Sequence, residues 1–322
     1  FAVGGYGTIL HYDGRSWSAL NSGTTEELHD VWGSSATDVF AVGDNGTILH
    51  YNGSRWTPWN AGTTENLLGI WGTSSTDIFA VGTSGTIVRY EGTSWIWTVM
   101  NSGTAEDLDA VWGASSTDVF AAGNDGVIRH FDGRTWTGMV SGTTEYLTGI
   151  WGAGGNTVFV CGDMGSILRY DGQSWSASRT GGSRWNAVTD FAFHRLNTNI
   201  VYASTTRAGV YISINQGGRW LNLGTPAYNV YAVSAASLFA ATDGGLLQCT
   251  GTGVIAGKVV QAGSQKGIDG ARIFTDSGVM TRSVYGEYMM VCPSGIHTVA
   301  VIADGQATQT LKNVVVLGAD VS

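Results

Sequence analysis

The chain has 322 residues and a formal net charge of −9, with 13% charged and 43% hydrophobic residues. This hydrophobic content supports a folded core, and the acidic balance disfavours nucleic acid and anionic lipid as partners. Apolar runs of about 18 residues do not occur, so the sequence predicts no direct membrane insertion.

A repeated segment organises the first 250 residues. The anchor "FAVG" or a close variant begins at these positions, with weaker copies at the last two: Phe1, Phe40, Phe79, Phe120, Phe159, Tyr202 and Phe239. Each full copy holds four short strand signals separated by Gly-rich hairpin turns. In the second copy they are Leu28–Gly33, Asp38–Gly43, Thr47–Tyr51 and Arg55–Trp59. A period near 40 with four strands per unit is typical of a β-propeller blade.

The sequence therefore predicts an all-β fold: a seven-bladed β-propeller over residues 1–250 and a small C-terminal β-sandwich. We name the strands of a blade A to D from the central axis outward. The first copy lacks strand A and the last lacks strand D. We expect a segment before Phe1 to supply both and close the ring. The alternative is an open ring with exposed edge strands.

Two columns of tryptophan recur once per blade. Strand A carries Trp32, Trp71, Trp112 and Trp151, each followed by Gly. Strand D is predicted to open with Trp17, Trp56, Trp95, Trp136, Trp175 and Trp220. A ring repeated in every blade indicates packing between blades rather than ligand binding. We expect each buried indole N–H to find a hydrogen-bond partner, and the Gly to mark a crowded position.

The sixth copy contains Ser213-x-Asn215-x-Gly217-x-x-Trp220. This stretch resembles the Asp-box (BNR) repeat, S-x-D-x-G-x-x-W, with Asn in place of Asp. The region as a whole resembles bacterial Asp-box and Ycf48-like seven-bladed propellers, and also tectonin-type lectin propellers. The resemblance implies the fold and leaves the function open, because propellers host many functions.

Residues 253–322 read as short alternating strands between Gly, Asp and Pro turns, which predicts the β-sandwich. The spacings Gly270-Ala271-x-Ile273, Gly286-x-Tyr288 and Pro293-x-Gly295 resemble a carboxypeptidase regulatory-like (transthyretin-like) domain. That resemblance implies a stalk or assembly module on a secreted or cell-surface protein.

The three cysteines form no metal-binding or haem-binding spacing. Cys161 stands where other copies have Val or Ala, which predicts a buried thiol. Whether Cys249 and Cys292 form a disulfide bond is left open.

A column of glutamates lies in the "GTTE" loops between strand D and the next strand A. Its members are Glu26, Glu65, Glu106 and Glu145. If loops alternate between faces, these loops share a face with the B–C turns, which carry Asp44, Asp125 and Asp163. Such an acidic face could contact a basic partner or a cation. The alternative is a set of solvated loops whose Glu residues make local backbone hydrogen bonds.

A second pair of columns places a basic residue on strand C and Asp at the start of strand B. The basic residues are His11, His50, Arg89, His130 and Arg169, and the acidic ones are Asp38, Asp77 and Asp118. Ion pairs or hydrogen bonds between the two columns are the plain interpretation. Because the basic column includes Arg, it does not predict a metal site, and no metal or cofactor is expected.

Three tryptophans lie outside the two columns: Trp59, Trp97 and Trp185. Exposed aromatic rings stack on sugars, so these residues are candidates for a glycan contact. The alternative is packing within strand D or a linker.

The sequence contains no Ser/His/Asp arrangement, nucleophile elbow or phosphate-binding loop. Sialidases also carry Asp-boxes, but here the arginines mostly fall in repeat columns. We therefore predict a non-enzymatic extracellular or cell-surface interaction module that binds protein partners in a larger surface assembly or filament. The first alternative is a glycan-binding lectin propeller. A sialidase-like glycoside hydrolase is less favoured.

Overall fold

The computed structural model describes residues 1–92, 96–178, 187–193, 200–206, 209–213, 216–218, 220–222, 230–234, 239–242, 245–248, 252–258, 272–275, 280–282, 287–293, 295–302 and 309–316. Beyond Trp220 the description concerns the backbone, apart from the buried side chain of Ile273. The chain divides into two compact units, Phe1–Thr189 and Asp190–Ser322, and each is described by itself.

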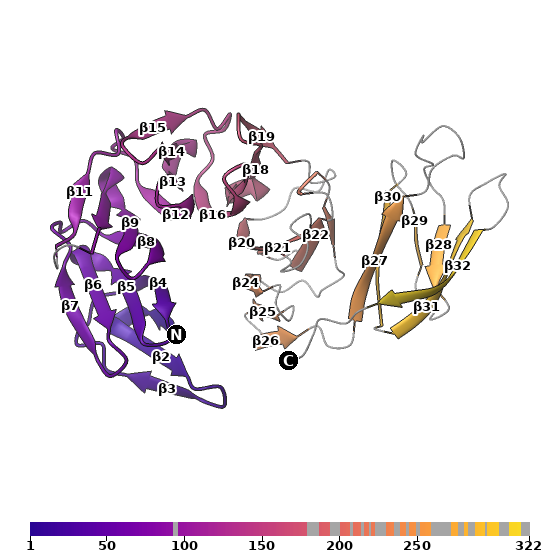
Figure 1. Ribbon diagram of the computed structural model, residues 1–322, viewed down its shortest axis with the longest axis horizontal. Helices are drawn as coiled ribbons and strands as arrows, with labels where there is room; N and C mark the ends of the chain where they lie inside the picture. The colour runs from indigo at the N-terminus through magenta and orange to yellow at the C-terminus, as the bar shows by residue number, and fades with distance from the viewer. Residues whose placement is uncertain are drawn as a thin grey trace. The chain divides into compact units, whose positions relative to one another are not determined.

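Antiparallel sheets, each a simple meander, follow one another along the repeat region (Figure 1). The first contains β1 (Ala2–Gly4), β2 (Thr8–Tyr12) and β3 (Trp17–Leu20). The second contains β4 (Leu28–Ser35), β5 (Asp38–Gly43), β6 (Thr47–Tyr51) and β7 (Trp56–Asn60). The third contains β8 (Leu67–Ser74), β9 (Asp77–Gly82), β10 (Ile87–Tyr90) and β11 (Thr98–Met100).

The next sheets repeat the same order. The fourth contains β12 (Leu108–Ser115), β13 (Asp118–Gly123), β14 (Ile128–Phe131) and β15 (Trp136–Met139). The fifth contains β16 (Leu147–Gly154), β17 (Thr157–Gly162), β18 (Ile167–Tyr170) and β19 (Trp175–Ala177). The sixth contains β20 (Val188–Phe193), β21 (Val201–Thr205), β22 (Gly209–Ser213) and β23 (Leu221–Asn222). The seventh contains β24 (Val230–Ser234), β25 (Phe239–Thr242) and β26 (Gly245–Gln248).

These seven sheets confirm the predicted blades. In the described residues, the five middle sheets have four strands, and the first and seventh have three. The first sheet begins with strand B of its copy and the seventh ends with strand C, which matches the strand count predicted from the repeats.

Short 3-10 turns join strands B and C in the first five blades. They are η1 (Gly5–Gly7), η2 (Asp44–Gly46), η3 (Thr83–Gly85), η4 (Asn124–Gly126) and η5 (Asp163–Gly165). The described residues contain no helix with the length and hydrophobicity that a membrane span requires.

The C-terminal strands form two further groups. They are β27 (Thr252–Lys258), β28 (Arg272–Thr275), β29 (Met280–Arg282), β30 (Glu287–Pro293), β31 (Gly295–Ile302) and β32 (Gln309–Val316). Strand β27 pairs with β30, and the other four form a sheet in the order β29-β28-β31-β32. The sandwich and the domain boundary after residue 250 stay predictions. Whether Cys249 and Cys292 form a disulfide bond stays open, because their side chains lie outside the described residues.

The core of the first unit lies between neighbouring blades. The inner strands β4, β8, β12 and β16 lie side by side in chain order (Figure 1). Phe40 of the second blade packs in one cluster with Ile78 and Trp97 of the third. The same arrangement recurs between the later blades, and Cys161 is a buried core thiol, as predicted. Each buried aromatic ring contributes about 2–3 kcal/mol through the hydrophobic effect.

The strand-A tryptophans pack between blades, as predicted. A Cβ built at Gly72 would lie 2.9 Å from the ring of Trp32, which belongs to the preceding blade. A Cβ at Gly113 would lie 2.5 Å from the ring of Trp71. Glycine therefore follows the tryptophan because the previous blade's indole occupies the space of a side chain.

The strand-D column needs one correction, in the third blade. Tyr90 pairs in the aromatic column with Trp97 at 5.7 Å, as Tyr51 pairs with Trp56 at 5.3 Å. Trp97 therefore holds the column position that the sequence assigned to Trp95, which lies outside the described residues. The cause is a C–D connection two residues longer than in the second blade, which moves the column position past the first tryptophan of "WIW".

The expected partners for the strand-D indoles are also missing in part. The Nε1 atoms of Trp56, Trp97 and Trp136 are buried, and their N–H groups donate no hydrogen bond within the described part of the chain. Trp175 does find one, because its Nε1 donates to the sulfur of Met139 at 3.4 Å. Ring packing thus outweighs the cost of an unsatisfied indole N–H in three blades.

Candidate interaction face

The B–C turns share one backbone geometry. Each has the form Gly-x-x-Gly, and its third residue adopts a left-handed conformation, with φ of 53° at Asn45. The second glycine, Gly46, has φ of 65°, and a Cβ there would lie 2.1 Å from the carbonyl oxygen of Thr63. Glycine is therefore required both by the backbone angle and by the close approach of the neighbouring loop.

The D–A loops lie directly on these turns. The backbone N–H groups of Asp44 and Thr83 donate to the carbonyls of Glu27 and Asn66, each at 2.9 Å. The prediction that the D–A loops and B–C turns share one face is therefore confirmed. We call this surface, made of η1–η5 and the D–A loops of the first unit, the B–C face.

Three of the seven predicted acidic residues have hydrogen-bond partners on this face. Glu26 accepts from the Nδ2 of Asn45 at 2.8 Å. Glu65 accepts from the hydroxyl of Thr83 at 2.7 Å and from that of Ser84 at 3.2 Å. A carboxylate oxygen of Asp44 lies 2.8 Å from the Nε2 atom of His29. Glu26 and Glu65 therefore hold the turn to the loop that enters the blade, and Asp44 joins the turn to strand A of the same blade.

The other four predicted acidic residues differ. In the described residues, no side-chain hydrogen bond or ion pair reaches the carboxylates of Glu106, Glu145, Asp125 and Asp163. The turn residues explain the difference, because Asp125 and Met164 stand where Asn45 and Ser84 supply donors. The structure thus separates a paired set in the second and third blades from an unpaired set in the fourth and fifth.

Tyr146, in the D–A loop that enters the fifth blade, lies among further carboxylates. Its hydroxyl donates a hydrogen bond to Asp109 of the fourth blade. Burial raises the pKa of Asp109, and the negative charge of Asp107 adds to the effect. Burial and the hydrogen bond to Asp109 raise the pKa of Tyr146, so its hydroxyl remains a donor. This pair is not among the site residues expected from the sequence.

Apolar side chains are also exposed on this face. Tyr6 is 92% exposed, Val140 is 87% exposed and Met164 is 70% exposed. Tyr6 and Met164 occupy the left-handed turn position, each with φ of 56°. A left-handed conformation is unfavourable for side chains other than Gly, Asn and Asp, by about 1–2 kcal/mol. In the sequence, Tyr6 and Met164 are recognisable as the third residue of a Gly-x-x-Gly turn.

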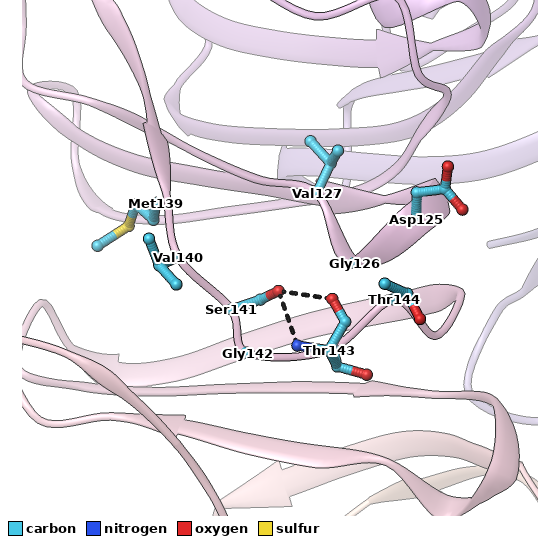
Figure 2. A pocket seen from close by; sticks show the side chains of 9 residues that line it. All are labelled: Asp125, Gly126, Val127, Met139, Val140, Ser141, Gly142, Thr143 and Thr144. Carbon is cyan, nitrogen blue, oxygen red and sulfur yellow. Dashed lines mark hydrogen bonds between the residues drawn. The ribbon is translucent and has the colours of Figure 1, made fainter.

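A shallow depression of about 700 Å³ lies on this face at the fourth blade (Figure 2). One side is formed by Asp125, Gly126 and Val127 from the turn η4 and the start of strand C. The other side is the chain from Met139 to Thr144, in which the hydroxyl of Ser141 donates to the carbonyl of Thr143 at 3.2 Å. Apolar and acidic side chains therefore meet at one concave place.

The second pair of columns lies at the opposite end of the blades and forms the predicted contacts. A ring nitrogen of His50 lies 2.7 Å from Asp38, and His130 lies 2.7 Å from Asp118. Arg89 donates twice to Asp77 and stacks over the Phe79 ring at 4.8 Å. These columns connect strands B and C within one blade, which confirms their structural interpretation.

The glycan candidates do not form a sugar platform in the described residues. Trp97 is 2% exposed, so the glycan hypothesis is wrong for this residue and its packing alternative holds. Trp59 is half-buried and packs against Phe40 and Tyr90 at the interface of the second and third blades. The residues at the same strand-D position in the first and third blades are Leu20 and Met100, which also indicates packing. Trp185 lies outside the described residues.

The fold defines an all-β propeller, and one comparison with a solved structure agrees. The solved structure of YCF48 from Cyanidioschyzon merolae is similar to this chain, with a TM-score of 0.60 and 15% sequence identity, over 76% of this chain and 89% of that one. A structure of YCF48 bound to D1 peptide has a TM-score of 0.38 and 14% identity, over 75% of this chain and 96% of that one. No protein-family model and no curated protein matches the chain. At this identity, the first likeness concerns the fold.

Proposed function

We propose that the chain is a non-enzymatic protein-interaction module whose propeller presents the B–C face to a protein partner. The observation that carries the proposal is the set of exposed apolar side chains at Tyr6, Val140 and Met164. Two of them hold an unfavourable left-handed backbone conformation at a turn tip. Backbone conformations and exposed side chains that lower stability and make no stabilising contact are typical of functional surfaces.

The use of polar residues elsewhere supports a role without catalysis. The His, Arg and Asp columns make the same intrablade contact in several copies, so their chemistry serves the fold. In the described residues, no group of three or more His, Cys, Asp or Glu side chains is placed to hold a metal ion. Propellers host many functions, so the proposal depends on the face and its residues and not on the likeness in fold.

The proposal extends to location and assembly. We place the protein outside the cell or on its surface, as a subunit of a larger assembly. Residues 1–250 would form the interaction propeller and residues 253–322 a carboxypeptidase regulatory-like β-sandwich that tethers it. The support is the resemblance of the C-terminal sequence to modules of surface proteins.

A face-specific crosslinking experiment tests the function. A photo-crosslinking amino acid is placed at Val140 or Met164 on the B–C face, in the cells that produce the chain. Matched probes at Arg134 and Gln173 occupy exposed C–D turns of the same two blades. We expect the first two probes to crosslink one and the same protein, identified by mass spectrometry. We expect the purified partner to bind the full chain in solution.

The control positions decide the outcome. Equal crosslinking from all four positions would indicate contact without a preferred face. Crosslinking only from Arg134 and Gln173 would place the partner on the opposite face. Either result contradicts the proposed function of the B–C face.

A further inference from the structure

The depression on the fourth blade is lined by the first part of the loop that leads to the fifth blade. Met139 and Val140 line it on one side and Val127 on the other (Figure 2). From Val140 the chain runs through Glu145 to Tyr146, whose carbonyl accepts the backbone N–H of Asp163 at 2.9 Å. The exposed Met164 follows directly in the turn η5. Apolar contact points therefore extend across two adjacent blades.

The loop that carries this surface packs tightly against the backbone of both blades. A Cβ at Gly126 would lie 2.2 Å from the carbonyl oxygen of Thr143, and one at Gly162 would lie 2.0 Å from that of Tyr146. The loop is therefore in direct contact with the turns of both blades. A partner would meet a surface whose shape is set in advance, which reduces the entropy lost on binding.

The charge of the surface indicates what kind of segment would fit. Within the described residues, the four carboxylates of Glu106, Asp125, Glu145 and Asp163 have no cationic partner. Arg129, on the strand that follows η4, donates instead to the carbonyl of Trp136 at 3.3 Å. The negative charges around the apolar contacts are thus available to an outside cation.

We infer that this surface binds an extended segment of a partner protein in which Lys or Arg alternates with apolar residues. The inference rests on the proposed function and names the partner's chemistry. In an extended chain, every second side chain points to the same side, so apolar residues can enter the depression. The long, flexible side chains of the intervening Lys or Arg residues can turn back to the carboxylates at its rim. Phosphate-rich partners such as nucleic acids or anionic lipids are disfavoured by the same charges.

The test uses two fluorescein-labelled peptides and the full 322-residue chain. The basic peptide is fluorescein-KVKLRVKL-NH2 and its acidic counterpart is fluorescein-EVELEVEL-NH2, each labelled at its N-terminus. Binding is measured by fluorescence anisotropy. We expect saturable binding of the basic peptide, little binding of the acidic one, and an affinity that falls about tenfold between low salt and about 0.3 M NaCl.

A matched pair of quadruple variants locates the binding. The test variant carries Glu106→Gln, Asp125→Asn, Glu145→Gln and Asp163→Asn. The control variant carries Asp13→Asn, Glu91→Gln, Asp132→Asn and Asp171→Asn, which change the net charge equally at C–D turns. Asn52 occupies the position of Asp13, Asp132 and Asp171 in the second blade, so the three Asp→Asn substitutions of the control fit the turn. We expect affinity for the basic peptide to fall at least about tenfold in the test variant and about twofold or less in the control.

Two results would overturn the inference: no binding of the basic peptide, or an equal loss of affinity in both variants. The proposed function has a separate outcome. A partner crosslinked through Val140 or Met164 together with a failed peptide test would retain the B–C face and reject the basic segment. Circular dichroism and thermal unfolding of both variants confirm that each is folded before binding is compared.

Discussion

The turns at the two ends of the blades are stabilised in different ways. At the C–D turns, Asp13 accepts the backbone N–H groups of Arg15 and Ser16 at 2.7 and 2.8 Å. Asp132 and Asp171 do the same in later blades. The backbone hydrogen bond from the residue just before the tryptophan is the first cause that lowers the pKa of each of these Asp residues.

The B–C turns keep one backbone but vary its third residue. Tyr6, Asn45, Ser84, Asp125 and Met164 all occupy the left-handed position. Asn45 and Ser84 donate to loop glutamates, whereas the other three leave no such bond in the described residues. Residues that recur from blade to blade therefore stabilise the fold, whereas residues that vary at a fixed backbone position mark a candidate contact surface.

The largest expected effect tests the core on which both faces depend. Trp97→Ala removes a fully buried ring and should lower the free energy of unfolding by about 3–5 kcal/mol. Trp59→Met places the residue found in the same register at Met100 and should cost about 1–2 kcal/mol, because Trp59 is only half-buried. Urea denaturation measures both. Similar losses in the two variants would contradict the assignment of Trp97 to the strand-D column.

A glycine pair compares the two faces directly. Gly126→Ala should lower the free energy of unfolding by about 3 kcal/mol, because alanine adds left-handed strain and a clash with the Thr143 carbonyl. Gly14→Ala, in a C–D turn with φ of 95° and open space around the Cβ, should cost about 1 kcal/mol. If the two variants unfold at the same urea concentration, the loop is not packed on the turn as described.

Asp30 gives a pH-dependent prediction from the inner strands. Its carboxylate accepts the N–H of Ile70 in the next blade at 2.9 Å, and burial raises its pKa to about 6. Between pH 4 and 6 the folded chain therefore binds more protons here than the unfolded chain. The free energy of unfolding should fall as pH rises through this window, by up to about 1.4 kcal/mol per pH unit.

The Asp30→Asn variant supplies the reference for that slope. Asparagine does not titrate and keeps one carbonyl acceptor for a backbone N–H. The stability of the variant relative to the natural chain should therefore increase from pH 4 to pH 6. Parallel stability curves over this range, measured by urea unfolding, would show that Asp30 has an ordinary pKa.

The smallest effect is expected when the turn residues of two blades are exchanged. Asp125→Asn should place an amide near Glu106, as Asn45 places one near Glu26, and raise the free energy of unfolding by about 0.5 kcal/mol. Asn45→Asp removes the donor from Glu26 and should lower it by a similar amount. Thermal unfolding at low salt compares the pair. Changes of the same sign in both variants would contradict the division into paired and unpaired carboxylates.

Most of the propeller followed from the sequence because its repeats encode the turns and the inter-blade rings. The period near 40, the Gly-x-x-Gly turns and the tryptophan columns predicted strands, turns and the shared face of Glu26 and Asp44. The choice between Trp95 and Trp97 did not follow, because a two-residue insertion shifts the register without changing the local pattern. Pairing between β10 and β11 decides it.

The division of the acidic residues into a paired and an unpaired set can be predicted in part from the sequence. Comparing Asn45 and Ser84 with Asp125 and Met164 shows which loop glutamates face a donor at a turn tip. What the sequence could not show is that the turn and the loop are in contact across about 20 residues of chain. The buried indoles without partners were also not predictable, because the choice between ring packing and a hydrogen bond depends on side chains of the neighbouring blade.

Amide NMR of the full chain, titrated with the basic peptide, shows which face of the propeller binds it. We expect shift changes concentrated at residues 125–127, 140–146 and 163–164. We expect unchanged signals at the C–D turns, residues 13–16 and 171–174. Shift changes centred on the C–D turns, or none at saturating peptide, would contradict the assignment of the B–C face as the binding surface.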